Sequence, residues 1–568
     1  MTASDLRPLP THAVAAVTPA GKAATRVVAS RAVPGTTIVF LLVAALGAAV
    51  STYSVRTGHV FDYNDSLSHL TIARRVLDSA SPGSQQLGTV WPPVPHLLLM
   101  PWAQSLWLWS TGAAGAIVGT GSLAAAAAAL YRALARLSVH WAGRVAAVLV
   151  LAVNPSFLYL SSTALTEPVL VATAMLTIAA LARWATSTRH LSGGELAVFA
   201  GLPAAAGCLT RYEGWATAAA ATAYVLIVAL QRGNPLRRSV VLAGSFVAPS
   251  IAAILAWLAY NFAMYGDPLD FARGAYSASA FNAVYRAEGL MTTDGSLGLT
   301  LDTYAAGVRG IAGVSTLLLA TLGLLLMCLR WGLDRRALAV WVAAAPTAFL
   351  VYGLYSGQHI MMNEASLPVG AFNNRQALST LPWLAMLVGV GTSLAVTQHW
   401  RRPAAAPKRL PTAGHWRAAG TLTLLIGVLT VQQLWWAADY PGRASVLTEA
   451  VNNRATEADR TAAASWLGSH YDGGLLLLDE AAIPASPIVG IPLRQQINRS
   501  DGDLFRAALT RPAEHVRWIF MHHTSSDQPG TQQDLVGATL GADPPRIQAF
   551  REVHRAGSLV ILRRIEAP

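Results

Sequence analysis

The sequence predicts an α-helical polytopic membrane protein with a small α/β domain at its C-terminal end. Of the 568 residues, 53% are hydrophobic and 12% are charged, and this charged fraction is about half the value usual for soluble chains. The mean hydropathy is +0.42. Residues 441–568 contain a larger share of the acidic residues than their length would give. We therefore divide the chain into a lead at 1–34, a transmembrane domain at 35–440 and a water-soluble domain at 441–568.

Apolar blocks long enough to cross a bilayer recur along the transmembrane domain. A helix needs about 20 mostly apolar residues to cross roughly 30 Å of hydrocarbon. Such blocks lie at 35–53, 112–134, 142–160, 168–186, 195–210, 214–231, 239–262, 303–329, 337–355, 376–397 and 418–438. Since these are eleven blocks, an odd number, the two ends of the chain are predicted to lie on opposite sides of the membrane.

The basic residues between the blocks predict the orientation. If the disordered lead 1–34 is cytoplasmic, every other basic cluster falls on the cytoplasmic side as well, in agreement with the positive-inside rule. The clusters contain Arg132, Arg136, Arg144, Arg183, Arg189, Arg232, Arg237, Arg238, Arg330, Arg335, Arg336, Arg401, Arg402, Lys408 and Arg409. This topology explains the net charge of +12, so nucleic acid is not an expected partner. The domain 441–568 is predicted to be extracytoplasmic.

This orientation requires that the apolar stretch 95–109 does not cross the membrane. The stretch is short and rich in Trp, and it follows Pro92 and Pro93. These features predict a helix that lies in the outer interface. The outer face then also carries the connections 54–94, 161–167, 263–302 and 356–375.

Helix and strand patterns alternate within residues 441–568. Segments 462–471 and 503–509 are predicted as helices, and 474–479, 516–521 and 558–563 as strands. This alternation in a short segment predicts a small α/β domain.

Charged residues near the outer ends of the spans are the candidates for chemistry, because ionisable side chains at membrane depth are costly. Asp65 begins an amphipathic helix that also carries His69 and Arg74, and Glu167 begins a span next to Pro168. Each carboxylate also has a simpler interpretation. Asp65 could only cap its helix, and Glu167 could only be a favourable first-turn acid.

A charged hinge lies between two short spans at the outer face. It reads Thr210-Arg211-Tyr212-Glu213-Gly214. Its simpler interpretation is an internal ion pair between Arg211 and Glu213, which would contribute little if it were exposed.

These residues carry a resemblance to the family of GT-C-fold glycosyltransferases that use polyprenyl-phosphate sugars. This group resembles glycosyltransferase family 39, and it includes the aminoarabinose transferases and protein O-mannosyltransferases. Asp65, His69, Ala73 and Arg74 are similar to the D-E-x-x-Y-A-x-x-x-R pattern that opens the family's first outer loop. Ser66 replaces the Glu of this pattern, and His69 replaces its Tyr.

Further segments along the chain resemble the family's motifs in the same order. The segment from Gln86 to His96 is similar to its Pro-Pro segment, with Trp91 where relatives often have Lys. Glu167 is similar in placement to its second outer-loop acid, and the hinge at 210–214 to its T-R/K-x-x-G motif. The family's later motifs are matched by four short segments of this chain, which are Tyr260-Asn261, Tyr265-Gly266-Asp267-Pro268, Asn374-Arg375 and Leu381-Pro382.

The resemblance implies an inverting transfer of a sugar from a polyprenyl-phosphate donor to an extracytoplasmic acceptor, such as an envelope glycan, a lipid or a protein. Such a transfer needs a carboxylate to take the acceptor's proton and cations to hold the departing phosphate. Asp65 fits the base, and Glu167 fits a second acid that positions the acceptor or a cation. Arg211 and Arg375 fit the phosphate clamp, because the arginine fork binds phosphate oxygens bidentately. The remaining predicted substrate-binding residues are His69, His96, Tyr212, Glu213 and Asp267.

Metal dependence and two other classes of function stay open at this stage. Asp62, Asp65, Glu167 and His69 could supply ligands for a divalent cation, but their spacing matches no strict ligand pattern. His522 and His523 are adjacent on a predicted strand and face opposite ways, so they make a poor metal pair. A transporter or lipid flippase would share the same spans, although no inverted repeat is visible. A non-catalytic membrane scaffold is the third alternative.

Overall fold

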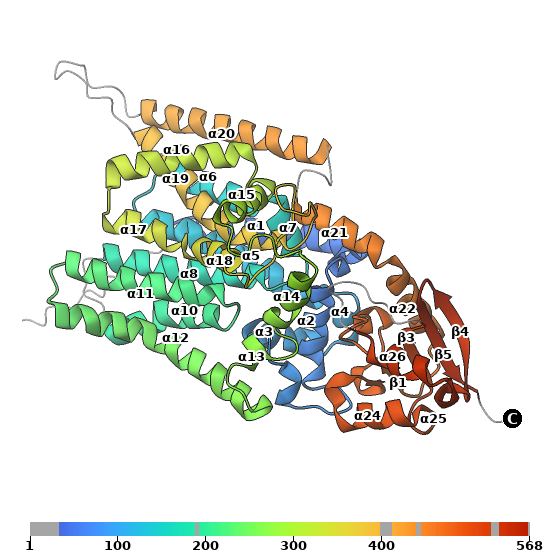
Figure 1. Ribbon diagram of the computed structural model, residues 1–568. Coiled ribbons are helices and arrows are strands. Elements are labelled where there is room, and N and C mark those ends of the chain that lie inside the picture. The colour runs from blue at the N-terminus through green and yellow to red at the C-terminus, as the bar shows by residue number, and fades with distance from the viewer. Residues whose placement is uncertain (1–32, 188–191, 398–411, 439–444, 524–532, 566–568) are drawn as a thin grey trace, which may run out of the picture. The chain divides into compact units, whose positions relative to one another are not determined.

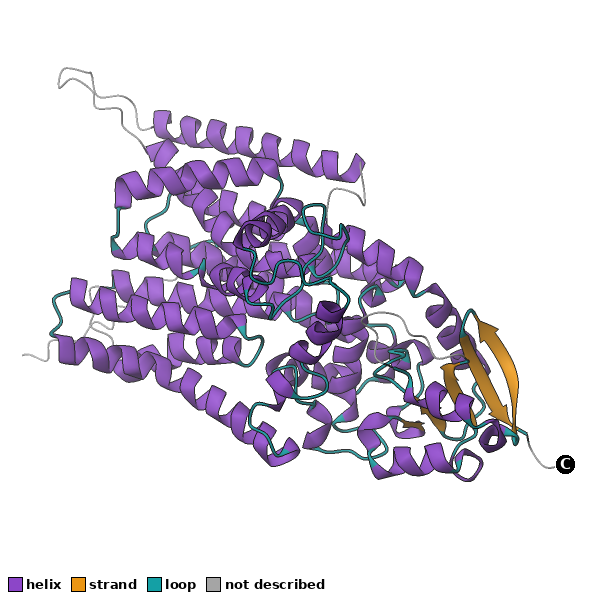
Figure 2. Ribbon diagram, viewed as in Figure 1, coloured by secondary structure: helices purple, strands orange, loops and turns teal. Residues whose placement is uncertain are grey.

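The computed structural model describes residues 33–187, 192–397, 412–438, 445–523 and 533–565. Residues 35–568 form one compact unit. Most of this unit is helical, as Figure 2 shows, and the strands gather in one region. In the described part of the chain the first strand begins at Leu476. Nearly all of the predicted disordered lead 1–34 lies outside the described residues, so that prediction is not tested.

Eight of the described helical segments are long and apolar enough to span a membrane. They are α1 Thr36–Thr57, α5 Ala113–Arg136, α8 Glu167–Thr186, α11 Glu213–Gln231, α12 Leu236–Tyr265, α16 Val314–Trp331, α19 Leu381–Thr397 with the preceding 3-10 helix η4 Asn374–Thr380, and α20 Thr412–Ala438. The pair α17 Arg335–Val342 and α18 Ala345–Tyr355 is apolar enough as one segment but is bent by 43°, as in a broken span or a re-entrant loop. The chain is therefore a multi-pass membrane protein.

The other two predicted spans are shorter helices. The block at 142–160 is α6 Trp141–Ala152 followed by α7 Pro155–Leu160. Asn154 separates them, because its Oδ1 atom accepts a hydrogen bond from Phe157 N at 3.0 Å and starts the second helix. The block at 195–210 is a short apolar helix at Gly193–Cys208, built from α9 Gly193–Leu196, the π-helical turn η3 Ala197–Gly201 and α10 Leu202–Cys208. The total of eleven crossings depends on these two and on the bent pair α17–α18, and it stays a prediction.

One predicted span is broken where the sequence pattern indicated a continuous helix. The block at 303–329 consists of α15 Leu297–Ala312 and α16, with Gly313 between them at a φ of 75°. A Cβ atom at Gly313 would lie 2.4 Å from the end of the Gln432 side chain, so another residue would displace that side chain and would also strain the backbone at this positive φ. The Oε1 atom of Gln432 accepts a hydrogen bond from Ser315 N at 3.0 Å and satisfies the start of α16. The prediction of one helix was wrong because this contact comes from another span.

The stretch 95–109 forms two short helices, α3 Val94–Ala103 and α4 Leu106–Ser110. Even the longer one reaches only about 15 Å at 1.5 Å per residue, too short to cross a bilayer. This agrees with the prediction that the stretch does not span the membrane. The other elements of the outer connections are η1 His59–Phe61, α2 Asn64–Arg75, η2 Ser84–Leu87, α13 Asp270–Arg273 and α14 Ala278–Ala287.

Small residues on α5 hold the turn that leads into α8. A Cβ atom on Gly115 would lie 2.6 Å from Ala164 N, and one on Gly119 would lie 2.2 Å from Ser161 O. Both glycines therefore allow the helix to touch the backbone of the turn, as small residues do in membrane helix packing. This contact fixes the start of α8, whose first residue is Glu167, and α5 and α8 lie side by side in the bundle (Figure 1).

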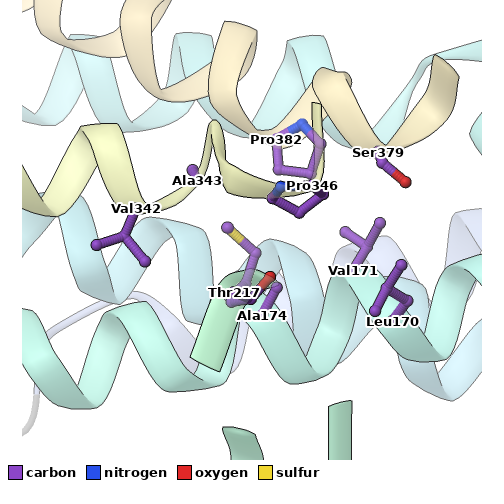
Figure 3. Close-up of a pocket in the computed structure, with 10 residues that line it drawn as sticks. Leu170, Val171, Ala174, Thr217, Val342, Ala343, Pro346, Ser379 and Pro382 are labelled. Carbon is purple, nitrogen blue, oxygen red and sulfur yellow. The ribbon is translucent and has the colours of Figure 1, made fainter. Parts of the chain in front are cut away.

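Close packing continues inside the bundle. A cavity of only about 10 Å³ remains between α8, α11, the α17–α18 break and α19. Figure 3 shows that its wall is almost entirely apolar, with Pro346 and Pro382 on one side and Leu170 and Val171 on another. This space is about one water in size, so it is a packing defect and not a substrate site.

The C-terminal part contains a five-stranded sheet of order β2-β1-β3-β5-β4. Strand β1 pairs in parallel with β2 and β3, and β5 pairs antiparallel with β3 and β4. The strands are β1 Leu476–Leu478, β2 Gln496–Ile497, β3 Trp518–His522, β4 Phe550–Ala556 and β5 Leu559–Arg564. The helices are α21 Ser445–Thr456, α22 Ala458–His470, α23 Ser486–Val489, α24 Asp503–Thr510, α25 Pro512–His515 and α26 Leu535–Ala542.

Alternate residues of the central strands face two hydrophobic cores. Leu476 and Leu478 pack with the residues of α22 on one face, and Leu477 packs with Phe505 of α24 and Val536 of α26 on the other. All five predicted elements of this segment are present, which confirms the small α/β fold. The short strand β2 and the exposed strand β4 were not predicted. Cys208 is buried, Cys328 is exposed, and both are free.

Candidate active site

The carboxylate of Asp65 makes an ion pair instead of capping its helix. The N-cap position of α2 is Tyr63, and no side chain caps the helix there. The Oδ2 atom of Asp65 instead accepts a hydrogen bond from Nη2 of Arg375. Burial acts to raise the pKa of Asp65, but the charge of Arg375 outweighs it and holds this pKa below its ordinary value. Asp65 is therefore ionised at neutral pH, and its side chain is still 34% exposed.

Glu167 lies between Arg211 and Arg375, the two arginines that the sequence predicts as a phosphate clamp. Its Oε1 atom is 3.1 Å from Nη1 of Arg211 and 3.7 Å from Nε of Arg375. The side chain is only 2% exposed, and its Oε2 atom has no hydrogen-bond partner among the described residues. Burial of this carboxylate is tolerable because two cations approach it. Glu167 thus does more than begin a helix.

The two arginines reach this point from distant parts of the chain. Arg211 lies in the loop between α10 and α11, and Arg375 lies in η4. Arg211 also contacts Oε1 of Glu213 at 3.0 Å and donates to Thr166 Oγ1 at 3.1 Å. The guanidinium of Arg375 lies 5.1 Å from the ring centre of Tyr63. We call Asp65, Glu167, Arg211 and Arg375 the carboxylate–arginine cluster.

His69 and His96 form a buried pair next to the cluster. Nδ1 of His69 is 2.9 Å from Nε2 of His96, and the ring of Trp91 lies 4.5 Å from that of His69. Burial lowers the pKa of His69 to about 4 in spite of the nearby charge of Asp65. Burial also lowers the pKa of His96, and the neighbouring His69 adds to this effect. Both rings are therefore neutral at pH 7 and cannot serve as cations for a phosphate.

Two of the remaining predicted substrate-binding residues lie next to the cluster, and one does not. Glu213 joins it through Arg211. Tyr212 donates to Val90 O at 2.9 Å and stacks on Phe271, so it links the hinge to the first outer loop and to α13. Asp267 instead accepts a hydrogen bond from Leu269 N at 2.8 Å just before α13. Among the described residues, no contact links Asp267 to the cluster.

Sequence reasoning missed Glu449, which is 2% exposed and comes from α21. Its two carboxylate oxygens accept hydrogen bonds from Asn373 N at 3.0 Å and Asn374 N at 3.2 Å, immediately before Arg375. Tyr63 was also missed, and its hydroxyl donates to Val446 O in the same helix at 3.0 Å. The helix α21 thus holds both the backbone and the aromatic ring beside Arg375. Nothing in the local pattern around Glu449 indicates a partner more than 70 positions away.

The stability of the protein is expected to depend on the ionisation of Glu449. Burial raises the pKa of this carboxyl from 4.5 to about 7, although Arg375 and two backbone N–H groups oppose the shift. The folded state therefore binds more protons than the unfolded state between these values, so this contribution to stability is present below pH 4.5 and lost as the pH rises through about 7. Melting temperatures of E449Q across this range should fall less steeply with pH than those of the wild type.

The matched control for this measurement is E514Q. Glu514 is 57% exposed and forms a surface ion pair with Arg511, so its replacement should leave the slope unchanged. Burial also raises the pKa of Glu480 to about 7, and E449Q should therefore remove only part of the wild-type slope. If the melting temperature of E449Q fell with pH as steeply as that of the wild type, the raised pKa of Glu449 would not contribute to the pH dependence of stability.

The described residues give no support for a metal centre. No group of three or more His, Cys, Asp or Glu side chains is arranged among them to hold a metal ion. Asp62, one of the four candidate ligands, instead contacts Nδ1 of His59 at 2.7 Å and lies 3.8 Å from Arg454. In the cluster itself, the positions around the carboxylates are taken by guanidinium groups.

Comparisons with known proteins identify the fold. No protein-family model and no curated protein sequence matches the chain. The crystal structure of ArnT from Cupriavidus metallidurans bound to undecaprenyl phosphate is similar with a TM-score of 0.54 at 14% identity, over 94% of this chain and 99% of that chain. The apo state of the same protein gives a TM-score of 0.51 at 14% identity, over 94% and 100% of the two chains. The chain therefore has the GT-C fold, as the order of its outer-loop motifs predicted.

Proposed function

We propose that this protein is an integral-membrane inverting glycosyltransferase that transfers a sugar from a polyprenyl-phosphate donor to an extracytoplasmic hydroxyl. The observation that carries the proposal is the carboxylate–arginine cluster, in which Asp65 and Glu167 meet Arg211 and Arg375 at one end of the bundle. The shared fold adds support, since the similar structure of ArnT contains undecaprenyl phosphate. Envelope glycans, lipids and proteins are the acceptor classes for this reaction.

In this mechanism Asp65 is the general base. The acceptor hydroxyl attacks the anomeric carbon and gives its proton to the carboxylate of Asp65. The bond between the anomeric carbon and the phosphate oxygen breaks, and the polyprenyl phosphate leaves with one more negative charge than it had in the donor. The arginines stabilise this developing charge. Because the nucleophile enters opposite the leaving group, the configuration at the anomeric carbon inverts.

The ion pair between Asp65 and Arg375 couples donor binding to activation of the base. A carboxylate held by a guanidinium is a weak base, because the cation lowers its pKa. The donor phosphate competes with Asp65 for Arg375, since both are oxyanions that fit the arginine fork. Once Arg375 turns to the phosphate, Asp65 loses its counter-charge and its proton affinity rises. The base is therefore activated only when a donor is present.

Glu167 has the role of holding the two guanidinium groups at a fixed separation. The sequence suggested that this acid positions either the acceptor or a cation. Its contacts with Arg211 and Arg375 favour the second role, with the guanidinium groups as the cations. The site contains three carboxylates, those of Asp65, Glu167 and Glu213, and only two guanidinium groups. One negative charge is therefore not balanced by the arginines. A phosphate therefore enters only if it displaces a carboxylate from an arginine.

A transfer assay with purified protein tests the function. The protein is reconstituted in vesicles with a radiolabelled polyprenyl-phosphate sugar and an extract of envelope lipids and glycans. We expect label to move covalently to an acceptor and free polyprenyl phosphate to accumulate in equal amount. Movement of the intact donor between leaflets without transfer would instead identify a flippase.

The orientation follows from the basic connections and is tested separately. We propose that the N-terminus is cytoplasmic and that residues 441–568 are extracytoplasmic, on the side that carries the cluster. Protease treatment of intact spheroplasts should remove the C-terminal domain. Cleavage of that domain only after lysis would contradict both the orientation and an extracytoplasmic acceptor.

A further inference from the structure

A cavity with charged residues in its lining lies at the end of the bundle away from the carboxylate–arginine cluster. It has a volume of about 320 Å³ and is enclosed by α1, α5, α8 and the α9–α10 segment, with Arg132 of α5 and Arg183 of α8 among its lining residues. Arg183 is 16 positions after Glu167 on one helix, which corresponds to about 24 Å at 1.5 Å per residue. That distance is most of the thickness of the hydrocarbon core, about 30 Å. The cavity therefore lies in the leaflet opposite the carboxylate–arginine cluster.

The described lining of this cavity carries more positive than negative charge, with Arg132 and Arg183 against the single carboxylate of Glu195. No described residue forms an ion pair with Arg132 or Arg183, and these two arginines lie within electrostatic range of each other. Glu195 also lines the cavity, and its carboxylate accepts a hydrogen bond from Ser192 N at 3.0 Å at the start of α9. Two arginines facing one carboxylate beside an apolar cavity leave a net positive charge, which favours an anionic ligand.

The walls of the cavity indicate that this ligand is a lipid. Its lining includes Phe40, Leu176 and Phe199, which are 38%, 41% and 59% exposed at the surface of the bundle. Alanines of α5 and α8 form the floor, so little side-chain volume fills the space between these helices. An apolar cavity edged by exposed aromatic and aliphatic side chains is open to hydrocarbon chains. A basic pocket of this kind between transmembrane helices on the cytoplasmic side suits an anionic lipid headgroup.

We propose that this cavity binds the phosphate headgroup of an anionic glycerophospholipid through Arg132 and Arg183, with the first acyl carbons of the lipid on the alanine floor. The volume is on the order of ten water molecules, which accommodates a phosphate and its glycerol but not a whole lipid. The acyl chains therefore continue along Phe40, Leu176 and Phe199 into the bilayer. The site does not depend on the proposed glycosyltransferase activity.

The experiment measures lipid bound to the detergent-purified full-length protein. Wild type is compared with R132Q/R183Q and with a control, R237Q/R238Q, whose arginines are exposed at the start of α12. Each protein is titrated with phosphatidylglycerol, with phosphatidylcholine and with inorganic phosphate, while native mass spectrometry and the melting temperature report binding. For wild type and control we expect bound phosphatidylglycerol and a higher melting temperature. For R132Q/R183Q we expect an apparent affinity roughly thirtyfold weaker, the equivalent of about 1 kcal/mol for each arginine.

A second variant keeps the test decisive if R132Q/R183Q does not fold. A180L places a larger side chain in the cavity and leaves both arginines in place, so it should also release the lipid. If either variant bound phosphatidylglycerol as tightly as the wild type does, the proposal would be wrong. An equal stabilisation by inorganic phosphate or by phosphatidylcholine would overturn it too, because the site would then recognise a free ion or any lipid.

Discussion

Replacement of Asp65 by Asn is expected to lower turnover at least about a hundredfold, the lower range of general-base contributions. Asn has nearly the same size as Asp and can still accept a hydrogen bond from Arg375, but it cannot take a proton from an acceptor hydroxyl. The melting temperature should change little, because Asp65 does not cap α2 and its side chain is 34% exposed. Single-turnover transfer of a radiolabelled sugar from its polyprenyl-phosphate donor measures the loss.

The matched control for this substitution is D267N. Asp267 was also a predicted substrate-binding residue, but its carboxylate accepts a hydrogen bond from Leu269 N and has no described contact with the cluster. Asn can accept the same bond, so D267N should keep wild-type turnover. If D65N retained half of the wild-type turnover, Asp65 would not be the base. The ion pair with Arg375 would then be structural.

Much of this fold could be predicted from the sequence, because the bilayer imposes strong rules on composition. Long apolar blocks and basic connections follow directly from the cost of polar groups in hydrocarbon. The breaks within spans could not be predicted so well. Gly313 alone does not indicate a break, since glycine is common in membrane helices, and the reason for it is the side chain of Gln432 on a distant span.

The candidate site shows the same division between local and distant information. Asp65, Glu167, Arg211 and Arg375 were all visible as rare charges at the outer ends of apolar blocks. Their convergence was an expectation, and the described contacts place them together. Glu449 was not visible, because a carboxylate is common in a water-soluble segment. Only tertiary packing distinguishes this buried acid beside Asn373 and Asn374 from its exposed neighbours.

Replacement of Arg375 by Lys is expected to weaken donor binding by about 1–2 kcal/mol, in the range of a charge-assisted hydrogen bond. Lys keeps the charge but not the planar fork that reaches both Asp65 and Glu167. Part of the loss should appear in kcat, because the clamp must bind the leaving phosphate more strongly as its charge develops. The control R309K replaces an arginine that is 54% exposed and paired with Glu364, and it should have wild-type kinetics. An unchanged kcat and KM in R375K would exclude the clamp.

The double variant D65N/R375K distinguishes a phosphate clamp from a simple structural pair. If Arg375 exchanges Asp65 for the donor phosphate, the two side chains act on the same step, and their effects on kcat/KM should not add. D65N removes the base that the exchange activates, so R375K should cost less in that background than in the wild type. The residual cost is then the loss of phosphate binding alone. R211K should show a smaller effect on donor binding, because Glu213, Glu167 and Thr166 already occupy the donors of Arg211. Fully additive effects of D65N and R375K would mean that the two residues act independently, and the coupling of donor binding to base activation would be wrong.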